Sequence, residues 1–198
     1  MNIPSRTAAV FLDRDGTLVR DVGYLCGEEQ LQILPRVPEA IRRLRERGFK
    51  VVVITNQSAV ARGRLAEMDL RKINHALRER LAQNGALLDG LYYCPHHPTE
   101  GIGSYKVECD CRKPNTGLIF RASEDLDLDP SISYVVGDQT IDIELAQRVG
   151  AQGVWLCAPQ NLAGNRVATR APCVADLWDA AQWIIGNWNS RNGRRVQR

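Results

Sequence analysis

The sequence of 198 residues lacks an apolar run long enough to cross a membrane, and its first seven residues lack the apolar core of a secretory signal. It also lacks low-complexity tracts and internal repeats. These absences predict a cytoplasmic protein with no membrane partner.

The sequence also has little excess charge, because the formal net charge is only +3. Much of that excess lies in residues 189–198, which contain four arginines and too few apolar side chains to pack. This segment is predicted to be a disordered tail, since an arm that binds nucleic acid would normally be more basic. Residues 1–188 are predicted to form one domain, which acts as a monomer and has no nucleic-acid partner.

Apolar segments alternate with amphipathic ones along most of the chain. Five segments have the length and apolar character of buried strands: residues 8–12, 50–54, 91–94, 133–136 and 153–156. Helices are predicted over residues 38–47, 66–84, 116–126, 141–149 and 175–188. This order predicts an α/β fold, a Rossmann-like three-layer sandwich with a mostly parallel sheet of five or six strands. The tryptophans of the last helix are expected to pack against the core: Trp178, Trp183 and Trp188.

Two aspartates, Asp13 and Asp15, directly follow the first predicted strand. At the carboxyl end of a strand, Asp13 can attack phosphorus, while Asp15, next to the turn at Gly16, can protonate the leaving oxygen and later activate water. The same pattern also occurs in ordinary turns and in calcium-binding loops. The pattern favours phosphoryl transfer to an aspartate, and three further segments support that interpretation.

Each of the three segments offers groups that suit a phosphate or its metal ion. The first presents a hydroxyl and amides in a turn after the second strand: Thr55, Asn56, Gln57 and Ser58. The second places two cations, Arg112 and Lys113, before a predicted helix, where they can hold a phosphate. In the third, Asp138 can complete an octahedral magnesium site with Asp13 and the backbone carbonyl of Asp15. Taken singly, the first two segments also fit a polar turn and a surface pair of cations.

Cysteine and histidine residues form two closely spaced pairs linked by a glycine-rich loop: Cys94 and His96, then Cys109 and Cys111. This spacing predicts a closed tetrahedral zinc site, with His97 as the weaker alternative ligand. The alternative is that the histidines face solvent and the cysteines are incidental. Because four protein ligands leave no open position, the zinc is expected to be structural. The other cysteines, Cys26, Cys157 and Cys173, are scattered, and Cys157 is expected to be a small core residue.

The four segments that contain Asp13, Thr55, Lys113 and Asp138 stand in the order of the four motifs of the haloacid dehalogenase superfamily, which the sequence resembles. The resemblance implies that Asp13 is a nucleophile that forms an aspartyl-phosphate. It implies that Asp15 is the general acid and base, that Asp138 adds a magnesium ligand, and that Thr55 and Lys113 stabilise the phosphoryl group. Mg²⁺ and a structural Zn²⁺ are the expected cofactors.

Members of this family often have an inserted cap domain that selects the substrate. Here residues 13–55 hold one helix and a short flap, and residues 55–113 hold one main helix and the cysteine loop. We therefore expect no large cap domain and an open site, with the cysteine loop as a partial wall.

Within the family, the motifs look like those of the phosphatases that remove the C7 phosphate of D-glycero-D-manno-heptose 1,7-bisphosphate in the synthesis of activated heptose. That resemblance implies a small phosphorylated sugar as substrate. It implies substrate contacts from Asp21, Val22, Gly23, Tyr24, Asn56, Gln57, Ser58, Arg112 and Gln139. Two residues depart from the pattern, since Gln139 stands where these enzymes commonly have lysine and Ala59 replaces an expected glycine.

Three alternatives remain open at this point. Histidinol-phosphate phosphatases share the aspartate pair and a similar cysteine loop, although residues 61–63 and the double histidine within residues 94–98 favour the heptose enzymes. A sugar-phosphate-binding scaffold without activity could have the same fold. An enzyme that transfers the phosphoryl group to a sugar would use the same aspartate.

Overall fold

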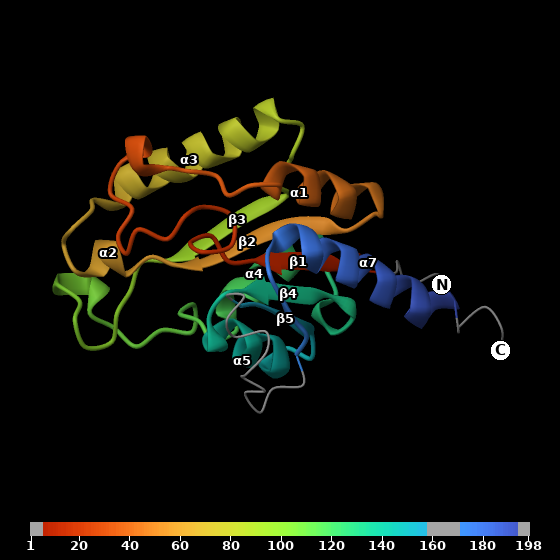
Figure 1. Ribbon diagram of the computed structural model, residues 1–198. Coiled ribbons are helices and arrows are strands. Elements are labelled where there is room, and N and C mark those ends of the chain that lie inside the picture. The colour runs from red at the N-terminus through yellow and green to blue at the C-terminus, as the bar shows by residue number, and fades with distance from the viewer. Residues whose placement is uncertain (1–5, 158–170, 194–198) are drawn as a thin grey trace.

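A parallel sheet of six strands, sandwiched between helices, forms the centre of the computed structural model, which describes residues 6–157 and 171–193 (Figure 1). The strands are β1 (Ala9–Leu12), β2 (Lys50–Asn56), β3 (Gly90–Cys94), β4 (Tyr134–Gly137), β5 (Gln152–Leu156) and β6 (Cys173–Val174). Their order across the sheet is β3-β2-β1-β4-β5-β6, and every neighbouring pair is parallel. The predicted fold class is confirmed.

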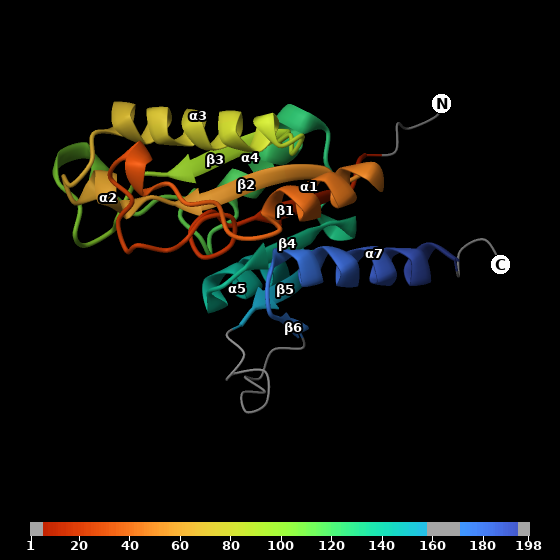
Figure 2. The same ribbon diagram turned by 45° about the horizontal axis from the view of Figure 1, so that its top comes forward.

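Helices cover both faces of the sheet, as the two views show (Figure 2). One face packs against α1 (Val37–Glu46), α3 (Glu67–Gln83) and α7 (Leu177–Gly193). The other packs against α4 (Gly117–Leu126) and α5 (Thr140–Arg148). The remaining helical elements are short: α2 (Ser58–Ala61) and the 3₁₀ turns Glu28–Gln30, Gly103–Tyr105 and Pro130–Ile132. Within the described residues, no large cap domain is inserted at the carboxyl ends of β1 and β2.

Strand β1 shows how the sequence produces two cores. Val10 and Leu12 point to the core beneath α1, α3 and α7, whereas Ala9 and Phe11 point to the core beneath α4 and α5. All four side chains are fully buried, because successive residues of a strand face opposite sides and both sides are covered. Each large apolar side chain buried in this way contributes about 1.5–3 kcal/mol to stability. The sheet therefore holds the end of β1 rigidly, and Asp13 is the next residue.

Helix α1 begins and ends where its sequence predicts. Pro38 lies in its first turn, where a missing N–H costs nothing, and Gly48 follows its end with a φ of +84°. Arg43 and Arg45 lie in the last turn, where positive charge is favourable. This helix returns the chain to the amino end of β2, so that β2 runs parallel to β1.

The carboxyl-terminal part of the fold differs from the sequence-based expectation in two ways. Strand β6 has only two residues and was not predicted, and Cys173 in it forms a disulfide with Cys157, with Cα atoms 5.9 Å apart. Cys157 is buried, as expected, but it and Cys173 are paired and not scattered. Disulfides are uncommon in reducing compartments, so the disulfide lends no support to the predicted cytoplasmic location.

Helix α7 packs through its tryptophans, as predicted. Trp188 meets the ring of Phe49 edge-on at 5.1 Å between centroids, and Trp183 meets Tyr134 in the same way at 6.4 Å. The helix continues to Gly193, so part of the segment expected to form a disordered tail is helical, and residues 194–198 lie outside the described part of the chain. No helix among the described residues combines the length and apolarity that a membrane crossing requires.

Candidate functional site

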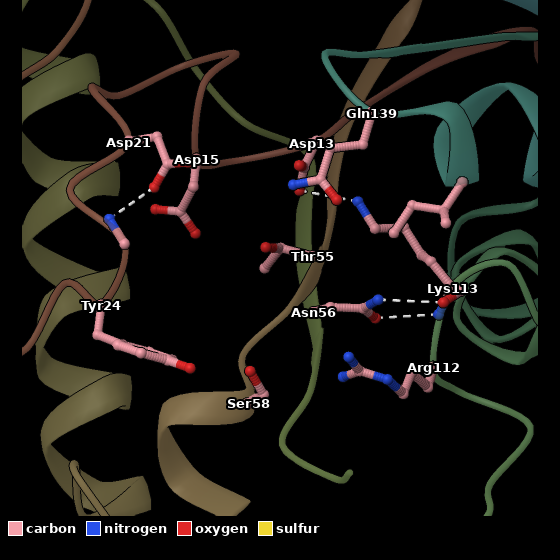
Figure 3. Close-up of a pocket in the computed structure, with 12 residues that line it drawn as sticks. Asp13, Asp15, Asp21, Tyr24, Thr55, Asn56, Ser58, Arg112, Lys113 and Gln139 are labelled. Atoms are coloured by element: carbon pink, nitrogen blue, oxygen red, sulfur yellow. Dashed lines mark hydrogen bonds and ion pairs between the residues drawn. The ribbon is translucent and has the colours of Figure 1, made fainter. Parts of the chain in front are cut away.

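Most of the residues predicted to act in catalysis or to bind substrate line a pocket of about 310 Å³ at the carboxyl ends of the central strands (Figure 3). The predicted magnesium ligand Asp138 is not part of its lining. Asp13 directly follows β1, Thr55 and Asn56 end β2, and Asp138 directly follows β4. The pocket is lined by Asp13, Asp15, Asp21, Gly23, Tyr24, Thr55, Asn56, Ser58, Arg112, Lys113, Gln139 and Ile141. Crevices at this edge of open parallel sheets are the usual ligand sites of α/β proteins.

Two predicted substrate contacts are not part of the pocket lining. Val22 is 42% exposed, and Gln57 is buried beneath the pocket, where its amide hydrogen-bonds other side chains. Local sequence could not distinguish these two residues, because both adjoin residues that do line the pocket. Ile141, in the first turn of α5, lines the pocket but was not predicted.

Lys113 joins two buried carboxylates. Its ammonium nitrogen lies 2.8 Å from Asp13 Oδ1 and 2.7 Å from Asp142 Oδ1, and the lysine is only 4% exposed. Burial alone would lower the pKa of Lys113, but attraction to these carboxylates outweighs burial and raises the pKa. Lys113 is therefore a fixed positive charge beside Asp13 throughout the neutral range.

Asp138 has the features expected of a residue that needs a cation. Its Oδ1 atom is buried and has no hydrogen-bond partner among the described residues. Burial, reinforced by repulsion from Asp13 and Asp142, raises the pKa of Asp138 to about 7. Oxygens of these three carboxylates lie within 4.8 Å of one another, while opposite ligands of an octahedral Mg²⁺ lie about 4.2 Å apart.

A divalent cation fits this group because it would neutralise the repulsion and satisfy the Asp138 oxygen. Asp142 is less available as a ligand, since its carboxylate accepts hydrogen bonds from Lys113 and from the backbone N–H of Gln139, at 3.2 Å, where it helps to begin α5. The backbone at Asp138 is also fixed, because the indole N–H of Trp155 donates to its carbonyl at 3.0 Å. Asp13 and Asp138 are thus the carboxylates best placed for an ion.

Asp15 is held on its core-facing side by Arg14, which the sequence analysis did not select, and by Gln57, which was expected to contact substrate. The buried guanidinium of Arg14 contacts both carboxylate oxygens, with Nη2 at 3.0 and 2.9 Å. Gln57 Nε2 donates to Asp15 Oδ2 at 2.8 Å and to Thr55 Oγ1 at 2.9 Å. Gln57 therefore links Asp15 to Thr55 and lies beneath the pocket.

Asn56 ties β2 to the loop that contains the cations. Its side-chain Nδ2 donates to the carbonyl of Lys113 at 3.1 Å, and its Oδ1 accepts from the backbone N–H of Lys113 at 2.9 Å (Figure 3). The amide that was predicted to meet substrate is thus largely used to position Lys113.

The flap after β1 forms the opposite wall of the pocket. Asp21 accepts a hydrogen bond from the backbone N–H of Gly23 at 2.8 Å, and Gly23 has a φ of +79°, which favours glycine. The ring of Tyr24 faces the pocket, with the guanidinium of Arg64 4.4 Å and that of Arg62 5.8 Å from its centroid. These cation–π contacts fix the aromatic wall.

A second cluster of metal-ligating groups lies beside the pocket. The closest pairs are Cys109 with Cys111, whose sulfurs are 3.2 Å apart, and His96 Nδ1 with Cys111 Sγ at 3.3 Å. Cys94 Sγ lies 3.5 Å from Cys109 Sγ and 3.8 Å from His96 Nδ1. The edges of a tetrahedral zinc site are about 3.8 Å long, so the four groups can bind zinc with little rearrangement.

The alternative ligand, His97, lies outside this cluster. Its Nδ1 accepts a hydrogen bond from the backbone N–H of Glu100 at 3.0 Å, so this nitrogen helps to shape the loop. The burial of Cys94 at the end of β3 also argues against incidental cysteines.

The cysteine loop is attached to the pocket at several points. Arg112, which lines the pocket, donates from Nη1 to the carbonyl of His96 at 3.0 Å. The backbone N–H of Ile102 donates to the carbonyl of Ala61 at 2.8 Å, and Arg62 forms an ion pair with Glu100. The loop therefore holds Arg112 and, through Glu100, supports Arg62, whose guanidinium lies over the ring of Tyr24. The loop is thus part of the pocket wall.

Comparisons with known proteins agree with this geometry. The family model for haloacid dehalogenase-like hydrolases matches residues 19–150. The chain is 36% identical over 181 residues to the D-glycero-beta-D-manno-heptose-1,7-bisphosphate 7-phosphatase of Salmonella typhi, a match that spans 90% of each protein. It is 43% identical over 145 residues to the protein of the same name from Haemophilus ducreyi, spanning 73% of this chain and 79% of the relative.

A solved structure shows the same architecture with ligands bound. The D,D-heptose 1,7-bisphosphate phosphatase from B. bronchiseptica, complexed with magnesium and phosphate, superposes with a TM-score of 0.78 at 28% sequence identity. The superposition covers 91% of this chain and 99% of that protein. The resemblance first drawn from four short segments therefore extends over nearly the whole fold.

Proposed function

Because the chain belongs to the haloacid dehalogenase-like hydrolases, we propose that it is the phosphatase that removes the C7 phosphate of D-glycero-D-manno-heptose 1,7-bisphosphate. The chain is a phosphoric monoester hydrolase, as its family and a relative with 36% identity over 90% of both sequences show. The substrate is taken from the names of such relatives. The observation that best supports phosphatase activity is the convergence of Asp13, Asp15 and Lys113 in one pocket.

In the proposed first step, a carboxylate oxygen of Asp13 attacks phosphorus. The new bond joins Asp13 to the phosphoryl group, the bond between phosphorus and the C7 oxygen breaks, and Asp15 gives its proton to that oxygen. Asp13 suits this role because β1 fixes its backbone and Lys113, 2.8 Å from Oδ1, offsets its charge. The product of this step is an aspartyl-phosphate and the dephosphorylated C7 alcohol.

In the second step, Asp15 takes a proton from water while the water oxygen attacks phosphorus. The bond between phosphorus and Asp13 breaks, inorganic phosphate leaves, and Asp15 is again protonated. Thr55 can donate its hydroxyl proton to a phosphoryl oxygen, because it lines the pocket and its own oxygen accepts from Gln57. A Mg²⁺ held by Asp13, Asp138 and the backbone carbonyl of Asp15 would supply Lewis-acid stabilisation of the phosphoryl oxygens.

The rest of the sugar phosphate would lie between the flap and the cysteine loop. Arg112 can bind an anionic group with two parallel hydrogen bonds, and Tyr24 offers an aromatic face to the sugar. Asp21, Ser58 and Gln139 complete the polar lining. Because Gln139 adds no positive charge, Arg112 and Lys113 are the cations that line the pocket.

The decisive experiment measures Mg²⁺-dependent phosphate release from both anomers of heptose 1,7-bisphosphate. Fructose bisphosphate and histidinol phosphate are assayed in parallel as alternative substrates. We expect the highest kcat/KM with one of the heptose anomers and loss of activity in Asp13→Asn, whose amide is not a nucleophile. Asp125→Asn, the same change on α4, is the matched control and should retain activity, since Asp125 contacts Tyr92 away from the pocket.

Other outcomes would each contradict part of the proposal. Preference for histidinol phosphate would replace the substrate, and product formation that requires a sugar acceptor would indicate a phosphotransferase. Tight binding of the bisphosphate without turnover would indicate a binding scaffold. Activity that survives in Asp13→Asn would remove the aspartyl-phosphate.

We also propose that Cys94, His96, Cys109 and Cys111 hold one structural zinc ion. The support is the short distances among their ligand atoms and the absence of an open position in a four-ligand site. Metal analysis of the purified protein tests this, and we expect one zinc per chain. A protein that contains none would contradict the proposal.

Finally, we propose that a single copy of the chain is sufficient for activity. The support is that one chain brings together in one pocket the proposed nucleophile, the general acid and base, and two cations: Asp13, Asp15, Arg112 and Lys113. Gel filtration at assay concentrations checks this, together with the specific activity, which should not depend on protein concentration. Location in the cytoplasm remains a prediction.

A further inference from the structure

The guanidinium of Arg14 is buried next to the catalytic pocket but does not line it. The residue is 1% exposed, although arginine is rarely buried without partners. Its Nε and Nη2 atoms contact both oxygens of Asp15 at 2.9–3.2 Å, while Asp15 itself reaches the pocket. Arg14 thus holds the carboxylate of Asp15 from the side that faces the core.

Arg14 is itself held by two other elements of the fold. Its Nη1 atom donates to Asn74 Oδ1, on α3, at 2.9 Å, and Nη2 donates to Gln57 Oε1, after β2, at 2.8 Å. Gln57 in turn donates to Asp15 Oδ2, which closes a ring of three side chains. A planar guanidinium with five N–H donors can satisfy these partners together, whereas a lysine ammonium lacks the fork that spans a carboxylate.

We propose that Arg14 is a positioning residue that fixes the orientation of the Asp15 carboxylate, so that one of its oxygens faces the reacting groups. This inference rests on the proposed function, because it assigns a purpose to the orientation of the general acid and base. Catalytic groups must be held close to productive geometry by such supporting contacts, since small displacements cost large factors in rate.

The hydrogen bonds indicate which oxygen of Asp15 exchanges the proton. Oδ2 accepts from both Arg14 and Gln57, whereas Oδ1 contacts only Arg14 among the described residues. Oδ1 accepts from the Nε and Nη2 atoms of Arg14, whereas Oδ2 accepts from the same two atoms and from Gln57 as well. Oδ1 is therefore the less engaged oxygen, and under this proposal it exchanges the proton with the leaving oxygen and with water.

Two leaving groups separate this positioning role from a merely structural one. An alkyl phosphate needs a proton on its leaving oxygen, but 4-nitrophenyl phosphate releases a phenolate that leaves without one. Hydrolysis of the aspartyl-phosphate needs Asp15 in both cases. A variant with a misplaced Asp15 should therefore form the phosphoenzyme readily from the aryl phosphate and then hydrolyse it slowly.

The test uses Arg14→Lys, which keeps the charge but loses the fork, in stopped-flow assays of the whole protein with Mg²⁺ and 4-nitrophenyl phosphate. We expect a burst of nitrophenolate equal to the enzyme concentration, followed by turnover about 10–100-fold slower than in the wild type. With an alkyl phosphate, we expect the first step to slow as well. Asn74→Ala, which removes the partner of Arg14 on α3, should show the same pattern more weakly and provides the test if Arg14→Lys does not fold.

The matched control is Arg45→Lys, because Arg45 pairs with Asp89 and neither residue lines the pocket. It should show wild-type rates in both phases. Equal losses of burst rate and turnover in the Arg14 and Asn74 variants, or wild-type turnover in Arg14→Lys, would overturn the proposal while leaving the phosphatase assignment intact. A wild-type protein that releases no phosphate from any substrate would overturn both.

Discussion

Two clusters of metal-ligating side chains lie on either side of Arg112 and Lys113, and they differ in almost every physical respect. The first consists of the carboxylates of Asp13 and Asp138, which follow buried strands, and of Asp142 in the first turn of α5. The second consists of Cys94, His96, Cys109 and Cys111 on and after β3. The carboxylate cluster borders the substrate pocket and already contains the ammonium of Lys113. The thiol cluster encloses its own centre.

Under the proposed function, this difference separates an ion that would take part in chemistry from one that would hold a loop. Hard oxygen ligands with room for water and substrate suit Mg²⁺, which keeps part of its coordination shell free. Three thiols and an imidazole suit zinc and leave no position for a substrate. Removing the first ion should therefore abolish turnover with little effect on folding, and removing the second should do the reverse.

The largest expected effect follows removal of the divalent cation from the carboxylate cluster. Transfer into Mg²⁺-free buffer by gel filtration, without a chelator that would also remove zinc, should lower kcat by about 10³-fold, because a bound divalent ion supplies several kcal/mol of charge stabilisation in the transition state. Excess Mg²⁺ should restore the rate fully. Thermal unfolding measured alongside should change little, and a large, irreversible drop in Tm would erase the contrast between the two clusters.

Replacement of Lys113 should have the next largest effect. In Lys113→Met the buried carboxylates Asp13 and Asp142 lose the ammonium that pairs with both of them, and kcat should fall by about 10²-fold. Because the lost charge leaves the repulsion unbalanced, Mg²⁺ should raise the Tm of this variant more than that of the wild type. Activity assays and thermal unfolding at several Mg²⁺ concentrations check both parts.

Cys109→Ser tests the second cluster. We expect loss of the bound zinc and a Tm lower by about 5–10 °C, since about 2–3 kcal/mol shifts Tm by about 2–4 °C per kcal/mol in a chain of this size. KM should rise because Arg112 is held by the carbonyl of His96. Cys26→Ser, a change at an exposed free cysteine, is the matched control. Unchanged zinc content in Cys109→Ser would contradict the ligand assignment.

The smallest effect concerns the anchor between the cysteine loop and α3. Glu67 accepts hydrogen bonds from Tyr105 at 2.7 Å and Tyr93 at 2.8 Å, and these bonds lower the pKa of its carboxyl. A lowered folded-state pKa contributes stability that is present above the unfolded value of 4.5 and is lost as the pH falls through the folded value.

Glu67→Gln should therefore lower Tm by about 1–2 °C at pH 7, and the difference from the wild type should shrink as the pH falls through the lowered folded-state pKa of Glu67. Comparing the two proteins at each pH cancels the effect of acid on the cysteine cluster. A difference that stays constant from pH 7 to pH 3 would show that the ionised carboxylate is not what anchors the loop.

The sequence was sufficient to predict the centre of the site. Asp13, Thr55 and Asp138 each follow or end an apolar segment, and parallel strands bring their carboxyl ends to one edge, so the pattern implied their proximity. The cysteine cluster was equally accessible, because its spacing restricts the possible geometries. Each of these predictions depended on local sequence and one rule of topology.

What the sequence did not reveal depends on contacts between distant residues. The role of Arg14 requires Asn74, which is sixty positions away, and nothing in the local pattern distinguishes Arg14 from a surface arginine. Gln57 was expected in the pocket because its neighbours are there, but its side chain lies beneath the pocket and donates a hydrogen bond to Asp15 Oδ2. Strand β6 escaped prediction because its two residues are too few to show a pattern.

The hydrogen bond from the indole of Trp155 to the carbonyl of Asp138 gives the protein a built-in optical probe. The other three tryptophans lie on α7, so replacing them with phenylalanine isolates a single fluorophore whose partner adjoins the carboxylate expected to bind the ion. Its emission would then report occupancy of that centre directly, in real time and without any substrate. Titrations of different divalent cations could thus be compared in the resting enzyme.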